Sequence, residues 1–138
     1  MNHNVNSLLR TIKKLPLMAA LMLLASCAAP AETPSFRQVT TNEAIAIMEK
    51  ETGYIILDVR RPDEFTAGHI PGAINIPNES IDTRPIPQLP DKNQLILVYC
   101  RSGNRSKQAS AKLAALGYTN IVEFGGINSW PGETVSGE

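Results

Sequence analysis

One short polar segment, Cys100-Arg101-Ser102-Gly103-Asn104-Arg105, brings a thiol and two guanidinium groups together along the chain. It follows an apolar run at 95–99 and precedes a helical pattern, so the sulfur would lie at the end of a buried strand, where a helix begins. The unpaired N–H groups and the positive dipole end of a helix start attract an anion, and Gly103 lets the backbone curl without a clash at Cβ. Because such electropositive surroundings lower the pKa of a thiol, the segment predicts an activated nucleophile in an anion-binding loop.

An alternative interpretation makes Cys100 a small apolar side chain buried at a strand end. That interpretation predicts apolar neighbours, whereas two arginines follow within six residues. We therefore expect Cys100 to be the nucleophile, and the five residues after it to bind an anionic substrate: Arg101, Ser102, Gly103, Asn104 and Arg105. Either arginine alone could be a solvated surface charge, but as a pair in one tight loop at least one is expected to point inward.

Alternating strand and helix patterns predict the fold that positions this loop. Nearly continuous apolar runs are typical of buried strands in a parallel sheet, and a capping box, prolines and glycines delimit the segments between them. We expect strands at 36–39, 54–59, 73–76, 95–99 and 121–124, helices at 41–52, 62–67 and 106–116, an irregular stretch at 78–92 and a fraying C-terminal segment at 131–138. This order predicts an α/β fold, a small three-layer domain with a parallel sheet and helices on both faces.

The predicted sheet also indicates where a site would be. In open parallel sheets the functional crevice lies beyond the carboxyl ends of the strands. Cys100 follows the strand at 95–99, and Asp58 lies at the end of the strand at 54–59. Both residues therefore fall at the edge where a site is expected.

The first 26 residues differ in character from the rest of the chain. They carry three basic side chains and no acidic one, followed by an apolar run at 15–25, which is the layout of a secretory signal. The run is too short to cross a bilayer as a helix. It ends in Leu24-Ala25-Ser26-Cys27, which resembles the lipobox of bacterial lipoproteins, whose cysteine is acylated and becomes the mature N-terminus.

These features predict three parts: a lipoprotein signal peptide at 1–26, a tether at 27–35 beginning with lipidated Cys27, and a folded domain at 36–138. Several acyl chains would anchor the chain stably to a membrane. Ala28 follows the cysteine, where an aspartate often marks inner-membrane retention, so we expect the periplasmic face of the outer membrane. The alternative is a plain secretory signal that leaves Cys27 free, and a disulfide with Cys100 is then the alternative for an exported protein.

Composition excludes several classes of function. Thirteen basic and thirteen acidic side chains give zero formal charge, so the chain lacks the basic footprint of a nucleic-acid-binding protein. Of the two cysteines and two histidines, the expected folded domain at 36–138 holds only Cys100 and His69, too few for the usual four-ligand zinc site. We expect no metal, no cofactor, no nucleic-acid partner and a monomer.

Several segments together resemble the rhodanese homology domain. In chain order they are Leu57-Asp58-Val59-Arg60, Glu64-Phe65, the run from Gly68 to Pro77 (GHIPGAINIP), Cys100 to Ser106 (CRSGNRS) and Gly125 to Trp130 (GGINSW). The resemblance covers about residues 36–130. It implies a single-domain sulfurtransferase in which the cysteine carries a sulfane sulfur as a persulfide.

Other residues in these segments are interpreted as structural. Asp58 and Arg60 look like a pair that supports or positions a loop rather than a catalytic pair. Histidine is a frequent general base in enzymes, but the run around His69 resembles a structural turn of the family, so we expect no catalytic role for it. Trp130 is expected to be a packing anchor.

The length of the loop separates two chemistries on this kind of scaffold. Related phosphatases place five residues between the cysteine and an arginine, whereas four separate Cys100 from Arg105. We expect transfer of sulfane sulfur from thiosulfate or a persulfide to a thiol or cyanide, through a persulfide on Cys100. The small anionic donor would meet an external thiol acceptor, because the domain has no second cysteine to release the sulfur. The alternatives are a non-catalytic sulfur-sensing or protein-binding module and, disfavoured by the loop, a phosphatase.

Overall fold

The computed structural model describes residues 28–30 and 33–138. The expected signal peptide and Cys27 lie outside the described residues, so both stay predictions. Residues 28–30 and 33–35, which belong to the expected tether, are exposed and without regular secondary structure. Within the described part of the chain, no helix has the length and apolar character needed to span a membrane.

Five parallel strands form a single sheet in the order β1-β5-β4-β2-β3. Their bounds are Arg37–Gln38 (β1), Ile55–Asp58 (β2), Ile74–Asn75 (β3), Ile96–Cys100 (β4) and Ile121–Gly126 (β5). Every residue of central β4 is buried, because its largely apolar side chains face covered layers on both sides of the sheet. All five strands were expected from the sequence, and the structure confirms the parallel sheet.

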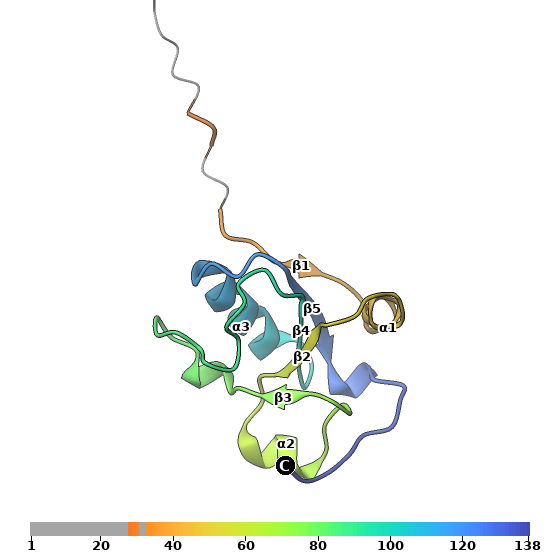
Figure 1. Ribbon diagram of the computed structural model, residues 1–138. Coiled ribbons are helices and arrows are strands. Elements are labelled where there is room, and N and C mark those ends of the chain that lie inside the picture. The colour runs from red at the N-terminus through yellow and green to blue at the C-terminus, as the bar shows by residue number, and fades with distance from the viewer. Residues whose placement is uncertain (1–27, 31–32) are drawn as a thin grey trace, which may run out of the picture. The chain divides into compact units, whose positions relative to one another are not determined.

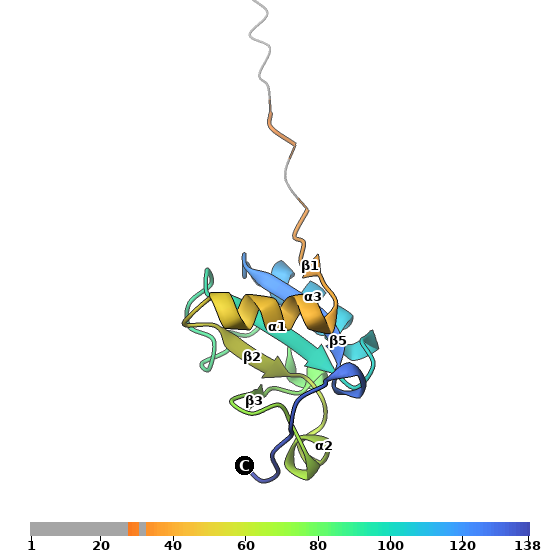
Figure 2. The ribbon, with the colours of Figure 1, turned by 90° about the vertical axis from the view of Figure 1, so that its right-hand side faces the viewer.

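Helices cover both faces of this sheet (Figures 1 and 2). Helix α1 (Thr41–Lys50) packs on one face, where its Ala44 joins a core cluster with Leu97 and Phe124. Helix α3 (Asn104–Ala115) and the 3₁₀ turn η1 (Asn78–Ser80) cover the other, where Leu113 packs with Val98. Helix α2 (Pro62–Ala67) follows β2, and the turn η2 (Ile127–Ser129) follows β5. The predicted three-layer α/β architecture is confirmed.

Two helix starts position residues of the site. The capping box predicted for α1 is present, because the Glu43 N–H donates to Thr40 Oγ1 and the Thr40 N–H donates to the Glu43 carboxylate. Helix α3 begins at Asn104, two residues earlier than expected, since Gly103 adopts a φ of 116° and turns the chain directly from loop to helix. The start of α3 therefore lies closer to Cys100 than the sequence pattern indicated.

The C-terminal segment is bound to the domain, so the expectation that it frays is wrong for Val135 and Gly137. His69 and Val135 exchange two backbone hydrogen bonds of 2.8 and 2.9 Å, and the Gly137 N–H donates to the Thr66 carbonyl at 2.9 Å. These bonds use backbone groups alone, which leave no side-chain signature in a sequence.

Candidate active site

Cys100 is the last residue of β4, and the three residues after it connect directly to α3. The residue is only 1% exposed. Its Sγ accepts the backbone N–H of Gly103 at 3.1 Å and lies 3.4 Å from Ser106 Oγ. The loop thus closes around the sulfur, and Gly103 is required where φ is positive.

Burial and hydrogen bonding have opposite effects on the pKa of Cys100. Burial disfavours the thiolate and by itself raises the pKa of the thiol. Hydrogen bonds from the Ser106 hydroxyl and from the backbone N–H groups of Ser106, Gly103 and Ser102 outweigh burial, so the pKa of Cys100 lies below its ordinary value. The expected lowering is present, and its main cause is the ring of N–H and O–H donors rather than the arginines.

The two arginines of the loop have different surroundings. Arg105 makes a two-point ion pair with Glu64 of α2, with N–O distances of 2.6 and 3.0 Å. Its hydrogen bonds, acting against burial, lower the pKa of the Glu64 carboxyl to about 2. Arg101 is exposed and makes no ion pair within the described residues, although its carbonyl accepts the Asn128 N–H. Arg105 is therefore a fixed, largely compensated charge, whereas Arg101 is a free one.

Asp58 and Arg60 form a buried ion pair where the end of β2 connects to α2. Arg60 Nη2 lies 2.7 Å from Asp58 Oδ2 and donates to the Gly68 carbonyl at 2.7 Å. The Arg60 N–H also donates to Asp58 Oδ1. The pair thus ties both ends of α2 to the end of β2. Helix α2 carries Glu64, which in turn holds Arg105. This geometry fits the loop-positioning role expected for the pair.

Comparison with known proteins adds to this geometry. Residues 40–133 match the sequence model of the Rhodanese-like domain. The chain belongs to this family.

Named relatives and a solved structure agree with this membership. The chain is 41% identical over 71 residues to thiosulfate sulfurtransferase PspE of Escherichia coli, covering 51% of this chain and 68% of the relative. It is 33% identical over 107 residues to thiosulfate sulfurtransferase GlpE of Pseudomonas entomophila, covering 74% and 94%. A solved rhodanese with anions from E. coli superposes with a TM-score of 0.56 at 37% identity, covering 61% of this chain and 99% of that chain. The rhodanese-like fold expected from the sequence is confirmed, and the chain is a sulfurtransferase of this family.

Contacts within the rhodanese-like domain hold the side chain of His69 in place. Its side chain is buried, Nδ1 lies 2.8 Å from the Phe65 carbonyl oxygen, and its ring stacks on that of Phe65 at 3.7 Å between centroids. Trp130 packs against the cluster on the α1 face. Both residues thus have the structural surroundings expected of them.

Two residues beside Cys100 were missed from the sequence. Ser106, on the first turn of α3, is fully buried, and its hydroxyl donates to Glu123 Oε1 at 2.6 Å. Glu123, on β5, is 2% exposed and also accepts the Gly125 N–H at 2.8 Å. The available signal was an acid inside the otherwise apolar strand of the rhodanese-like domain, directly before Phe124 and two glycines.

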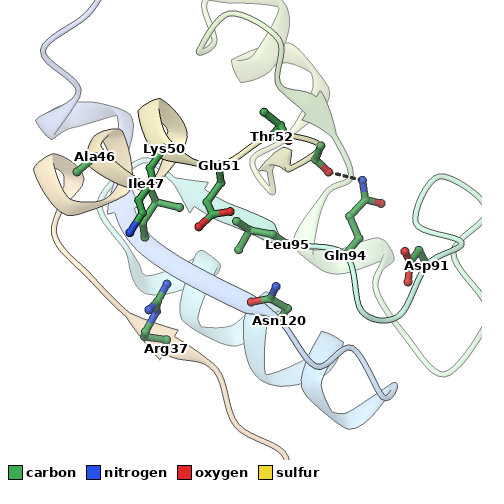
Figure 3. A pocket seen from close by; sticks show the side chains of 11 residues that line it. Arg37, Ala46, Ile47, Lys50, Glu51, Thr52, Asp91, Gln94, Leu95 and Asn120 are labelled. Carbon is green, nitrogen blue, oxygen red and sulfur yellow. Dashed lines mark hydrogen bonds between the residues drawn. The ribbon is translucent and has the colours of Figure 1, made fainter.

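A hollow of about 720 Å³ on the described part of the domain lies elsewhere (Figure 3). It opens at the amino ends of the strands, where Leu95 precedes β4 and Asn120 precedes β5, opposite to Cys100. Its lining combines basic Arg37 and Lys50 with acidic Glu51 and includes no cysteine. We therefore take the loop around Cys100, rather than this hollow, as the candidate active site.

Proposed function

We propose that Cys100 is the sulfur carrier of this sulfurtransferase and that thiosulfate or a persulfide is the donor. The observation that carries the proposal is the buried Sγ of Cys100, which accepts the Gly103 N–H inside a closed loop. The names of the relatives, thiosulfate sulfurtransferases, support the choice of donor. The loop offers N–H groups to a single sulfur, which suits a persulfide.

The transfer runs in two balanced steps. The Cys100 thiolate attacks the outer sulfur of thiosulfate, the sulfur–sulfur bond of the donor breaks, and sulfite leaves with the bonding electron pair. A thiolate or cyanide then attacks the terminal sulfur of the persulfide, and Cys100 leaves as the thiolate. Because Cys100 is the one free cysteine of the described residues, the acceptor in this scheme is an external molecule.

The loop residues share the binding of the donor. Exposed Arg101 attracts the dianion, and the backbone N–H groups of Ser102, Gly103 and Asn104 line the turn that receives the transferred sulfur. Arg105, held by Glu64, forms a rigid wall of the loop. Asp58 and Arg60 keep that wall in place without touching the donor.

The deciding experiment is the mass of the protein after incubation with thiosulfate. Gain of one sulfur atom is expected, together with its loss on addition of cyanide or a thiol. Cys100→Ser should gain none while remaining folded, because an alcohol does not carry sulfane sulfur. If the folded wild type gains no sulfur from thiosulfate or from a persulfide donor, the domain is a binding module instead.

We also propose that residues 1–26 export the chain and that Cys27 is lipidated, so that the domain faces the periplasm from the outer membrane. Support comes from the basic start, the apolar run at 15–25 and the lipobox-like end at Cys27. Cys27→Ser should convert an acylated membrane-bound species into an unprocessed or soluble one. Unchanged fractionation, with no lipid mass on the wild type, would refute lipidation. We expect the domain to be monomeric, which light scattering tests.

A further inference from the structure

Glu123 is a buried acid for which the sulfur-transfer scheme has no use. It lies on β5 between Gln38 of β1 and Val98 of β4, neither of which is charged. It makes no ion pair within the described residues. A buried carboxylate without a cation is costly, so its presence beside the reactive thiol calls for a physical explanation.

The other titratable groups near Glu123 are few. A hollow of about 310 Å³ beside the loop is lined by Glu123 together with exposed Glu43 and Lys107. The Glu43 carboxylate is already bonded to Thr40 at the start of α1. On the side of the loop, the titratable group facing Glu123 is Cys100, reached through Ser106.

The Ser106 hydroxyl links the protonation of Cys100 to that of Glu123. Its Oγ lies within hydrogen-bonding distance of Cys100 Sγ (3.4 Å), Glu123 Oε1 (2.6 Å) and the carbonyl oxygens of Gly103 (2.9 Å) and Gly125 (3.2 Å). A serine hydroxyl has one proton to donate, and a thiolate, a carboxylate and two carbonyls all accept. While Glu123 is ionised, it competes at 2.6 Å for the proton that would otherwise stabilise the thiolate.

We propose that Glu123 is a positioning residue that shares one proton with Cys100 through the Ser106 hydroxyl, so that the thiolate forms as Glu123 becomes a neutral carboxylic acid. The S–H proton moves to Ser106 Oγ, and the proton of Ser106 moves to Glu123 Oε1. No electron pair leaves and no co-reactant is needed. Neutral Glu123 then donates to Ser106, which turns its own proton toward the sulfur.

The arrangement avoids two buried anions joined by one side chain, since like charges at a shared site do not both ionise readily. It also gives the proton an exit, because Glu123 lines the hollow beside the loop. When the persulfide forms, the negative charge moves one bond further from Ser106 and Glu123 can ionise again. This inference rests on the proposed role of Cys100 in sulfur transfer.

The test counts protons during alkylation of Cys100. The full chain carries Cys27→Ser, so that Cys100 is its single thiol. Ultraviolet thiolate absorbance gives the thiolate fraction near neutral pH, and iodoacetamide is then added in weak buffer while mass spectrometry follows the alkylation. Alkylation of an isolated thiolate releases iodide and no proton, whereas here loss of the sulfur's charge should let Glu123 ionise and release close to one proton per thiolate.

Two variants assign the proton. Glu123→Gln should reduce the release to that of its own thiol fraction, because it keeps the shape of a neutral acid without the titrating proton. Glu43→Gln, which removes another acid lining the same hollow, should behave as the wild type. Three results would each overturn the proposal: release in the wild type that only equals its thiol fraction, release beyond the thiol fraction in Glu123→Gln, or release in Glu43→Gln that falls to its thiol fraction.

A measurement on the wild type alone covers the case in which Glu123→Gln does not fold. The infrared C=O band of a protonated carboxyl should be present before alkylation and lost after it, and its absence beforehand would overturn the proposal. None of these measurements uses a sulfur donor. A protein that fails to gain sulfur from thiosulfate can still show the shared proton, so the two proposals fail separately.

Discussion

The ion pair between Glu64 and Arg105 sets a measurable part of the stability of the site. The pKa of Glu64 falls from an ordinary 4.5 to about 2, through the hydrogen bonds from Arg105 and against burial. At about 1.36 kcal/mol per pKa unit, that fall corresponds to roughly 3.4 kcal/mol. The Arg105 and Glu64 side chains are 26% and 16% exposed, so water screens part of the interaction, and we expect about 2 kcal/mol.

Glu64→Gln removes the charge and keeps an oxygen for the Arg61 N–H, which Glu64 accepts at 3.0 Å. Urea unfolding at neutral pH should show a loss of about 2 kcal/mol. A carboxyl whose folded pKa is depressed stabilises the fold above its unfolded pKa, and that contribution disappears as the pH falls toward the folded pKa. The difference between wild type and variant should therefore shrink below about pH 5 and reach less than half its neutral value near pH 3.

Asp63→Asn is the matched control for this prediction. Asp63 is the neighbouring acid on α2, and its pair with Arg61 has side chains that are 69% and 62% exposed. Removing it should change the free energy of unfolding little at any pH. A loss in Glu64→Gln that is absent at neutral pH, independent of pH or matched by the control would refute the reasoning.

The loop around Cys100 sets three other expectations. Arg101→Ala should raise KM for thiosulfate several-fold without changing urea unfolding, because exposed Arg101 attracts a dianion; an equal rise for an uncharged persulfide donor would contradict that role. Gly126→Ala should lower the free energy of unfolding by about 3 kcal/mol and abolish activity, because its Cβ would clash with the Arg101 carbonyl. In Gly68→Ala the new Cβ meets only Thr134 Oγ1, at 3.7 Å, so the same unfolding assay should show a far smaller loss. Alkylation of Cys100 should follow an apparent pKa lower than that of a free cysteine alkylated in the same buffer, and an apparent pKa at or above that of the free cysteine would show that the donors do not stabilise the thiolate.

Local chemistry made much of this domain predictable. The start of α1 follows from Thr40 and Glu43, three residues apart, and the reactive loop follows from a cysteine placed between an apolar strand and a helix. Features of this kind are encoded by neighbours along the chain. The inner strands β2, β4 and β5 were equally visible, because burial on both faces favours nearly continuous apolar runs.

The partners of the loop were not predictable in the same way. Arg105 meets Glu64 across 41 residues and Ser106 meets Glu123 across 17. Such contacts depend on which strands are neighbours and in what register, which one sequence does not specify. This explains why two arginines were expected to act alike, although the structure leaves Arg101 free and binds Arg105.

The two outermost strands of the sheet, β1 and β3, are each only two residues long. An edge strand exposes unpaired backbone groups that can recruit a strand of another molecule, and shortening it is one way in which proteins block aggregation. Here neither edge offers enough backbone to template a growing sheet. The domain should therefore resist strand-to-strand aggregation when many copies are crowded together, and a variant that lengthened β1 with apolar residues would lose that protection.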